Sequence, residues 1–175
     1  MEKRYIILLT VLMAILMNLH ATNSVPDELA QALRARVVEV PDSVLIELDK
    51  IEAMKRPALP DFQISLLRGL TYNEKRMFSL VERYAQKVLE SDSISSHPKE
   101  RLNALTLLSV AQYYFGNYQK SIETSLKAIE MARKDGNKAS EYNILTTMAK
   151  KRLHAFCKYA IQDSQRSLVH FSNFQ

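Results

Sequence analysis

The segment Leu102–Lys134, LNALTLLSVAQYYFGNYQKSIETSLKAIEMARK, has the pattern of two antiparallel helices joined by a tight turn. The turn is predicted at Gly116-Asn117-Tyr118, because glycine adopts the left-handed conformation that ends a helix without the steric cost of a Cβ atom. A second glycine, Gly136, is expected to end the second helix in the same way. The segment therefore predicts a helical hairpin.

Apolar residues recur at helical spacing in both halves of this hairpin. The first helix carries two apolar stripes and is predicted to be an inner helix, with Tyr114 in the core and Tyr113 near the surface. The stripes are Leu102, Leu105, Leu108 and Phe115, and Ala104, Leu107, Ala111 and Tyr114. The second helix carries one stripe and is predicted to be an outer helix. Its apolar stripe consists of Tyr118, Ile122, Leu126, Ile129 and Ala132. The charged residues predicted to face solvent are Lys120, Glu123, Lys127, Glu130 and Lys134.

The hairpin resembles a tetratricopeptide repeat (TPR). The first helix of a TPR carries a Trp, a Leu-Gly pair and a Tyr, the turn is Gly-Asp/Asn-Tyr, and the second helix carries an Ala, a Phe or Tyr and an Ala-Leu pair. Leu108, the turn Gly116-Asn117-Tyr118 and the pair Ala128-Ile129 match the family pattern in register. The departures are Leu105 for Trp, Ser109 for Gly, Gln112 for Tyr, Ser121 for Ala, Ser125 for the aromatic residue and Arg133 for the closing Pro. The resemblance implies an all-α fold of antiparallel helical hairpins stacked as a short right-handed TPR-like α-solenoid.

A single hairpin cannot bury its own apolar face, so a repeat requires neighbours at a fixed period. A shift of 41 residues toward the N-terminus aligns Tyr72 with Tyr113 and predicts helices at about residues 61–72 and 76–90, with Lys75-Arg76-Met77 in place of the glycine turn. A shift of 40 residues in the other direction aligns Met148 with Leu108, and it predicts a third inner helix that continues to about residue 162.

The repeats are predicted to occupy residues 61–162, with Pro98 as the first residue of the central inner helix. We expect two short N-terminal capping helices within residues 25–60. Pro41 separates them, and Asp42 or Ser43 is expected to cap the second helix. Residues 163–175 lack an apolar stripe and are predicted to be an irregular tail.

The first 24 residues have the three parts of a secretory signal peptide. Lys3 and Arg4 precede an apolar run at 5–19, and small and polar residues follow. A helix of about fifteen residues spans ~22 Å, less than the ~30 Å hydrocarbon core of a bilayer. We therefore expect cleavage after Ala21 and export to the periplasm or the medium, with an uncleaved membrane anchor as the lesser alternative.

The composition argues against several classes of function. The net charge is +5 over 175 residues, and the basic residues are spread over every predicted helix, so we expect no nucleic-acid surface. The four histidines lack metal-binding spacing, and Cys157 near His154 is interpreted as a buried free thiol in preference to a catalytic couple. The sequence has neither a glycine-rich phosphate loop nor a Gly-x-Ser-x-Gly elbow. We therefore expect no enzyme activity, no metal and no cofactor.

The resemblance implies binding of a peptide or protein in a concave groove lined by the inner helices. The candidate binding residues are Tyr72, Asn103, Thr106, Val110, Tyr113, Asn143 and Thr146. The two tyrosines are the candidate anchors because tyrosine recurs at interface hot spots, and the alternative is that Tyr72 packs on Tyr113 as a seam. We expect an exported interaction module, similar to the outer sensory part of bacterial membrane-bound transcription regulators. The competing classes are a small helical periplasmic enzyme and a nucleic-acid-binding helical domain.

Overall fold

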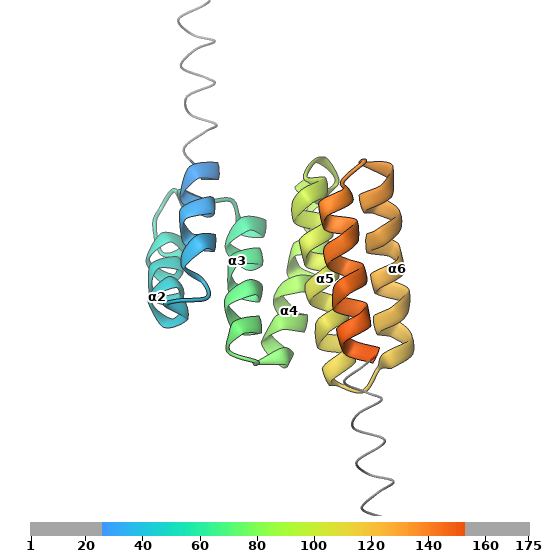
Figure 1. Ribbon diagram of the computed structural model, residues 1–175. Helices are drawn as coiled ribbons and strands as arrows, with labels where there is room; N and C mark the ends of the chain where they lie inside the picture. Colours follow the sequence, from blue (N-terminus) through green and yellow to red (C-terminus); the bar gives the residue numbers. More distant parts are fainter. Residues whose placement is uncertain (1–25, 153–175) are drawn as a thin grey trace, which may run out of the picture. The chain divides into compact units, whose positions relative to one another are not determined.

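The computed structural model describes residues 26–152, and the regular secondary structure in this range is entirely helical (Figure 1). Its elements are helix 26–36, α2 (Pro41–Glu52), α3 (Asp61–Glu74), α4 (Phe78–Leu89), the 3-10 helix η1 (Asp92–Ser96), α5 (Pro98–Tyr114), α6 (Tyr118–Lys134) and helix 138–152. The prediction of an all-α fold is confirmed, as is the start of the central helix at Pro98. The predicted signal peptide, the Cys157–His154 pair and the irregular tail lie outside the described residues.

The described chain forms two compact units that divide at 104/105, inside α5. The first unit contains the helices up to the start of α5, and the second contains the rest of α5, α6 and helix 138–152. No helix within residues 26–152 is both long enough and apolar enough to cross a bilayer.

In the first unit, α3 packs against both α2 and α4. The apolar core here consists of Leu33, Val37, Val44, Leu48, Ile51, Leu59, Ile64 and Leu67. The predicted cap of α2 is wrong: Pro41 is the first helical residue, and the N-cap residue Val40 makes no side-chain cap bond. Proline suits this position because its fixed φ is helical and its missing N–H would have no partner in the helix.

Arg68 of α3 forms ion pairs with two carboxylates of α2. Its side chain is 9% exposed, and its Nη2 donates to Asp49 Oδ1 at 2.6 Å and to Glu52 Oε2 at 2.7 Å. Burial opposes the charged form of Arg68, but the two carboxylates outweigh burial and raise its pKa. A buried cation is tolerated at this position because two carboxylates of α2 pair with it.

Three helices end in the same left-handed turn. In each, an N–H bonds to the carbonyl five residues earlier at 2.8–2.9 Å, and the residue before that N–H has a positive φ. The bonds are Met77 to Tyr72, Asn117 to Gln112 and Asn137 to Ala132, and the positive-φ residues are Arg76 (55°), Gly116 (78°) and Gly136 (64°). The predicted glycine turns are confirmed, and Arg76 adopts the same conformation without being a glycine.

The first two of these turns lie 40 residues apart in sequence, at Arg76 and Gly116. The backbone therefore relates Tyr72 to Gln112, since both carbonyls accept the closing bond of their turn. The predicted 41-residue register, which paired Tyr72 with Tyr113, is wrong by one residue. It followed the matching tyrosines because the arginine in the first turn hid the position of the helix end.

The buried face of α6 differs from the predicted one. Ile129 and Ala132 are buried as expected, but Tyr118, Ile122 and Leu126 are 39%, 43% and 54% exposed. The helix instead buries Ser121, Thr124, Ser125 and Ala128. Two of these hydroxyls bond to α5, Ser121 Oγ to the Ser109 carbonyl at 2.6 Å and Thr124 Oγ1 to Gln112 Oε1 at 2.9 Å. Small residues with satisfied hydroxyls thus replace the apolar stripe at this helix contact.

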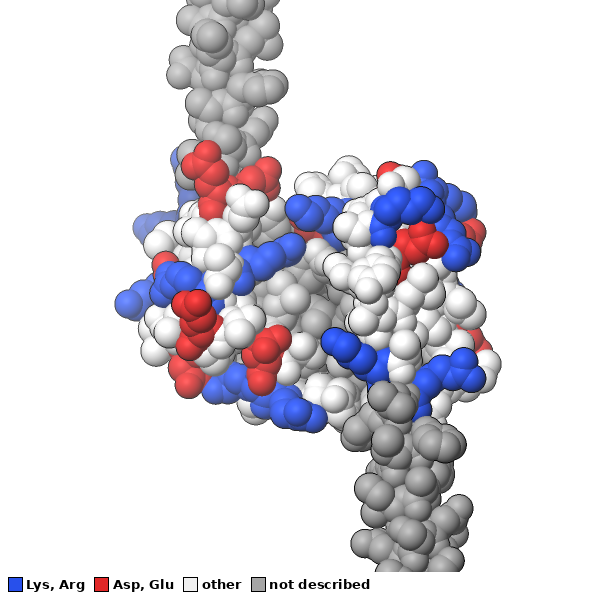
Figure 2. All heavy atoms as spheres, in the orientation of Figure 1, with Lys and Arg blue, Asp and Glu red and all other residues white. Residues whose placement is uncertain are grey.

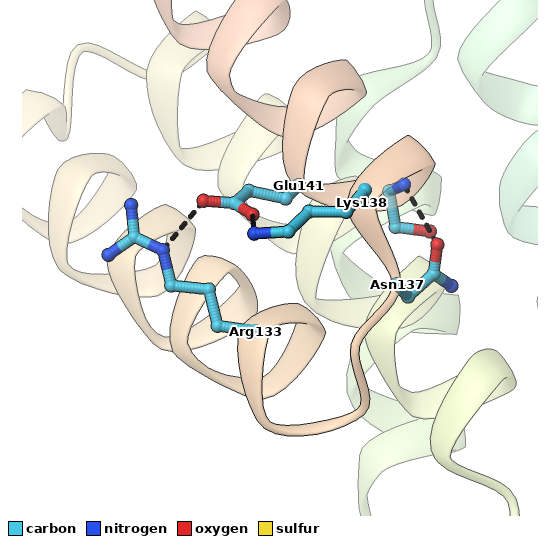
Figure 3. Close-up of polar contacts among 5 residues, drawn as sticks. Arg133, Asn137, Lys138 and Glu141 are labelled. Atoms are coloured by element: carbon cyan, nitrogen blue, oxygen red, sulfur yellow. Dashed lines mark hydrogen bonds and ion pairs between the residues drawn. The ribbon is translucent and has the colours of Figure 1, made fainter.

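The start of helix 138–152 is fixed by side chains on both sides of its turn (Figure 3). Asn137 Oδ1 accepts the Ser140 N–H at 3.0 Å, as in a helix N-cap. Glu141 accepts from Arg133 Nε of α6 at 2.6 Å and from Lys138 Nζ at 3.1 Å, and these two cations lower the pKa of its carboxyl group. The first residue of this helix, 138, lies 40 positions after Pro98, the first residue of α5, as the forward shift predicts.

Substitutions at the shared turn position should separate the cost of the left-handed backbone from the loss of a side chain. Both Arg76→Gly and Arg76→Ala remove the arginine side chain, but only glycine relieves the backbone strain. We expect Arg76→Gly to be about 1 kcal/mol more stable than Arg76→Ala in urea unfolding. A Cβ atom at position 116 would meet nothing within 4 Å, so Gly116→Ala should lose about 1 kcal/mol for conformational reasons alone. An Arg76→Ala protein as stable as Arg76→Gly would contradict this explanation.

Candidate functional site

The second unit contains a pocket of about 330 Å³ bounded by α5, α6 and helix 138–152. It is lined by Tyr113, Tyr118, Ser121, Ile122, Met148, Lys151 and Arg152. Aromatic and aliphatic side chains therefore make up most of the wall, and the cationic groups in the lining are those of Lys151 and Arg152. A pocket of this kind, apolar with a few placed polar groups, is typical of a ligand-binding site.

Tyr113 of α5 forms one wall and is only 9% exposed. Its hydroxyl donates to the Lys151 carbonyl at 2.8 Å, and its ring centroid lies 5.3 Å from that of Tyr118 and 5.5 Å from that of Tyr114. Tyr114 is 44% exposed. The prediction that Tyr114 is core and Tyr113 is near the surface is therefore wrong, because the buried hydroxyl of Tyr113 finds a backbone acceptor on helix 138–152.

A chain of hydroxyl groups runs from α5 to the amine of Lys151. Ser109 Oγ donates to the Thr106 carbonyl at 2.8 Å, and Ser121 Oγ donates to the Ser109 carbonyl at 2.6 Å. Lys151 Nζ donates to Ser109 Oγ at 3.1 Å and to Ser121 Oγ at 3.3 Å. The two serines are buried, so these bonds hold the amine at a fixed place in the wall of the pocket.

The environment of Lys151 disfavours its charged form. The ion pairs observed between residues 26 and 152 do not include Lys151. Its amine lies over the Tyr113 ring, whose centroid is 5.8 Å from Nζ. Burial lowers the pKa of Lys151 to about 8, as expected for an amine that loses water without gaining a carboxylate.

The predicted binding residues fall in both units. Of the seven, only Tyr113 lines the pocket. Thr146 Oγ1 bonds back to the Tyr142 carbonyl at 2.9 Å, while Asn143 is exposed. In the first unit the Tyr72 ring stacks on Tyr84 at 5.6 Å. Asn103, Thr106 and Val110 are half-buried along α5. Their grouping into a single groove stays a prediction.

Lys151 was missed because the run Lys150-Lys151-Arg152 has the composition of a solvated face. The available signal was helical spacing: Ile144, Met148 and Lys151 recur at intervals of four and three residues and so share one face of the helix. Ile144 is buried and Met148 is half-buried, and Lys151 follows them on the side that faces α5 and α6.

The first unit has a second hollow, of about 320 Å³ and more polar. Arg34, Lys99, Glu100 and Asp27 contribute mixed charges to it, and Gln63 donates to Asp27 Oδ1 at 3.2 Å. The Gln63 Oε1 atom is buried without a protein partner. A water molecule satisfies such an isolated acceptor at ordinary cost, so this hollow supports no assignment. The part of the chain that the structure describes also contains no group of three His, Cys, Asp or Glu side chains able to hold a metal ion.

No protein-family model, curated protein or solved structure matches this chain.

The pKa of Lys151 predicts a pH-dependent contribution to stability. Between about pH 8 and the value of ~10.4 of a solvated lysine, the unfolded chain binds the proton while the folded protein releases it. Rising pH therefore favours folding in this window. We expect the free energy of unfolding of the wild type, relative to Lys151→Met, to increase from about pH 8 to pH 10 and to stay constant below about pH 7.

Lys127→Met provides the matched control, because Lys127 is exposed on α6. Urea unfolding at several pH values measures both differences. The Lys127→Met difference should not follow this curve. A Lys151→Met difference that is flat across the alkaline range would show that the folded protein does not perturb this amine.

Proposed function

We propose that the chain is a TPR-like protein–protein interaction module, and that the pocket of the second unit receives an apolar side chain of a peptide or protein partner. The observation that carries the proposal is the pocket itself. Its volume of about 330 Å³ falls at the lower end of the range for ligand sites. Tyr118 and Ile122 line it while remaining 39% and 43% exposed, so the apolar wall continues onto the surface of α6.

The 40-residue spacing of the turns supports the repeat interpretation. In this register Gly69 corresponds to Ser109 and Tyr72 to Gln112. Gly69 and Tyr72 are the residues that the TPR pattern has at these two positions, where the central hairpin departs from it. The hairpin of α3 and α4 therefore has two of the six family residues that the hairpin of α5 and α6 lacks.

The charge of the second unit favours an acidic partner. Residues 105–152 contain eight Lys and Arg against four Asp and Glu, and one of these basic residues, Arg152, lines the pocket itself. On the side of the second unit that Figure 2 shows, acidic and uncharged side chains separate the basic ones, and the basic side chains form no continuous stripe. Separate cations next to an apolar pocket suit a peptide in which an aromatic or branched residue is flanked by Asp or Glu.

We further propose that the module acts outside the cytoplasm. The apolar run at 5–19, with Lys3 and Arg4 before it and small residues after it, supports export. A role as the sensory part of a signalling regulator, or as a remnant of one, is consistent with an exported binding module.

Selection from a phage-displayed library of random short peptides, with the full chain as bait, tests the binding proposal. We expect the enriched sequences to combine an aromatic or branched residue with neighbouring acidic residues. A labelled selected peptide should bind Ile122→Asp about 30-fold more weakly than the wild type, the effect of losing about 2 kcal/mol at an anchor contact.

Leu126→Asp is the matched control, since Leu126 is also on α6 and 54% exposed but does not line the pocket. Both substitutions are at exposed positions, so both proteins should keep the melting temperature of the wild type. Equal loss of binding in the two variants, or enrichment of peptides without apolar residues, would contradict the proposal.

A further inference from the structure

The hydrogen bonds around Lys151 match the donors of its neutral amine. Both serine hydroxyl protons are already donated to backbone carbonyls, Ser109 to Thr106 at 2.8 Å and Ser121 to Ser109 at 2.6 Å. The two hydroxyl oxygens therefore face Lys151 Nζ as acceptors, at 3.1 and 3.3 Å. A neutral amine has two N–H groups, and these two acceptors use both of them. Its lone pair is then not engaged by either serine.

The described residues around the amine include no carboxylate to balance its charged form. The titratable side chains in the pocket lining are Tyr113 from α5, Tyr118 from α6 and Arg152 from helix 138–152. None of them is an anion near neutral pH, and Arg152 is a second cation. Burial lowers the pKa of Lys151 to about 8, so about one tenth of the amine is neutral at pH 7.

We propose that Lys151 is a nucleophilic lysine that forms an imine with an apolar aldehyde or ketone bound in the pocket. A desolvated lysine with a free lone pair is the arrangement by which proteins activate an amine toward carbonyl compounds. Tyr113, Tyr118, Ile122 and Met148 make the surrounding wall apolar, which favours an uncharged ligand over a free anion.

The reaction needs no further reagent. The Nζ lone pair forms a bond to the carbonyl carbon, the carbonyl π electrons move to oxygen, and a proton passes from nitrogen to that oxygen through solvent. The resulting carbinolamine loses its hydroxyl group together with the remaining N–H proton as water. The products are an imine at Lys151 and one molecule of water.

Benzaldehyde and sodium cyanoborohydride, added to the full chain near neutral pH, test the proposal. The reductant converts each imine into a stable benzylamine, and peptide mapping by mass spectrometry measures the labelling rate at every lysine in one sample. The lower pKa increases the neutral fraction by about 300-fold over that of a solvated lysine, and the weaker basicity of the amine offsets part of this gain. We expect Lys151 to be labelled at least ~10-fold faster than the exposed Lys127.

Glyoxylate, a charged aldehyde of small size, serves as the comparison probe. The preference for Lys151 over Lys127 should be lower with glyoxylate than with benzaldehyde, because the apolar wall disfavours a carboxylate. The Lys151→Arg protein should lose the fast labelling, while Lys127→Arg should retain it. Labelling of Lys151 at or below the rate of Lys127 would overturn the nucleophile, and an equal preference with both probes would overturn the apolar ligand class. Neither result depends on a peptide partner, so this test is independent of the peptide selection.

Discussion

The close contact between α5 and α6 governs the architecture of the second unit. The buried residues of α6 include the small side chains of Ser121, Ser125 and Ala128, and Ser121 reaches the backbone of α5 directly. The buried hydroxyls of Ser121 and Thr124 carry no penalty for lost water, since Ser121 Oγ donates to the Ser109 carbonyl at 2.6 Å and Thr124 Oγ1 donates to Gln112 Oε1 at 2.9 Å. A satisfied polar contact thus replaces the apolar seam that a stripe of large residues would have formed.

Both features of the pocket follow from this contact. Because the small residues face α5, the large residues Tyr118 and Ile122 are displaced toward solvent, where they form the apolar rim. The same serines provide the acceptors that hold the amine of Lys151, and the Tyr113 hydroxyl anchors the Lys151 backbone. The pocket therefore combines an apolar wall with an amine that has neither full hydration nor a carboxylate partner among the described residues.

Helical periodicity and glycine placement predicted the helices and the turns at Gly116 and Gly136, because these signals are local. The register of the first hairpin was not predictable in this way, since Arg76 adopts a conformation that its side chain does not announce. The buried face of α6 and the burial of Tyr113 rather than Tyr114 depend on hydrogen bonds between helices, which apolar spacing does not report. Lys151 could have been suspected from its spacing with Ile144 and Met148, but its serine partners come from two other helices.

The direct test of this account is the titration of Lys151 itself. With lysine carbon-13 labelled at Cε, nuclear magnetic resonance follows the charge of each lysine with pH, and the Lys151→Arg protein assigns the signal. Burial without a compensating anion predicts a Lys151 midpoint at a pKa of about 8. A Lys151 midpoint at ~10.4, the value of a solvated lysine, would show that the amine lies in water. That result would contradict a site in which the amine is buried and bonded to the two serine hydroxyls.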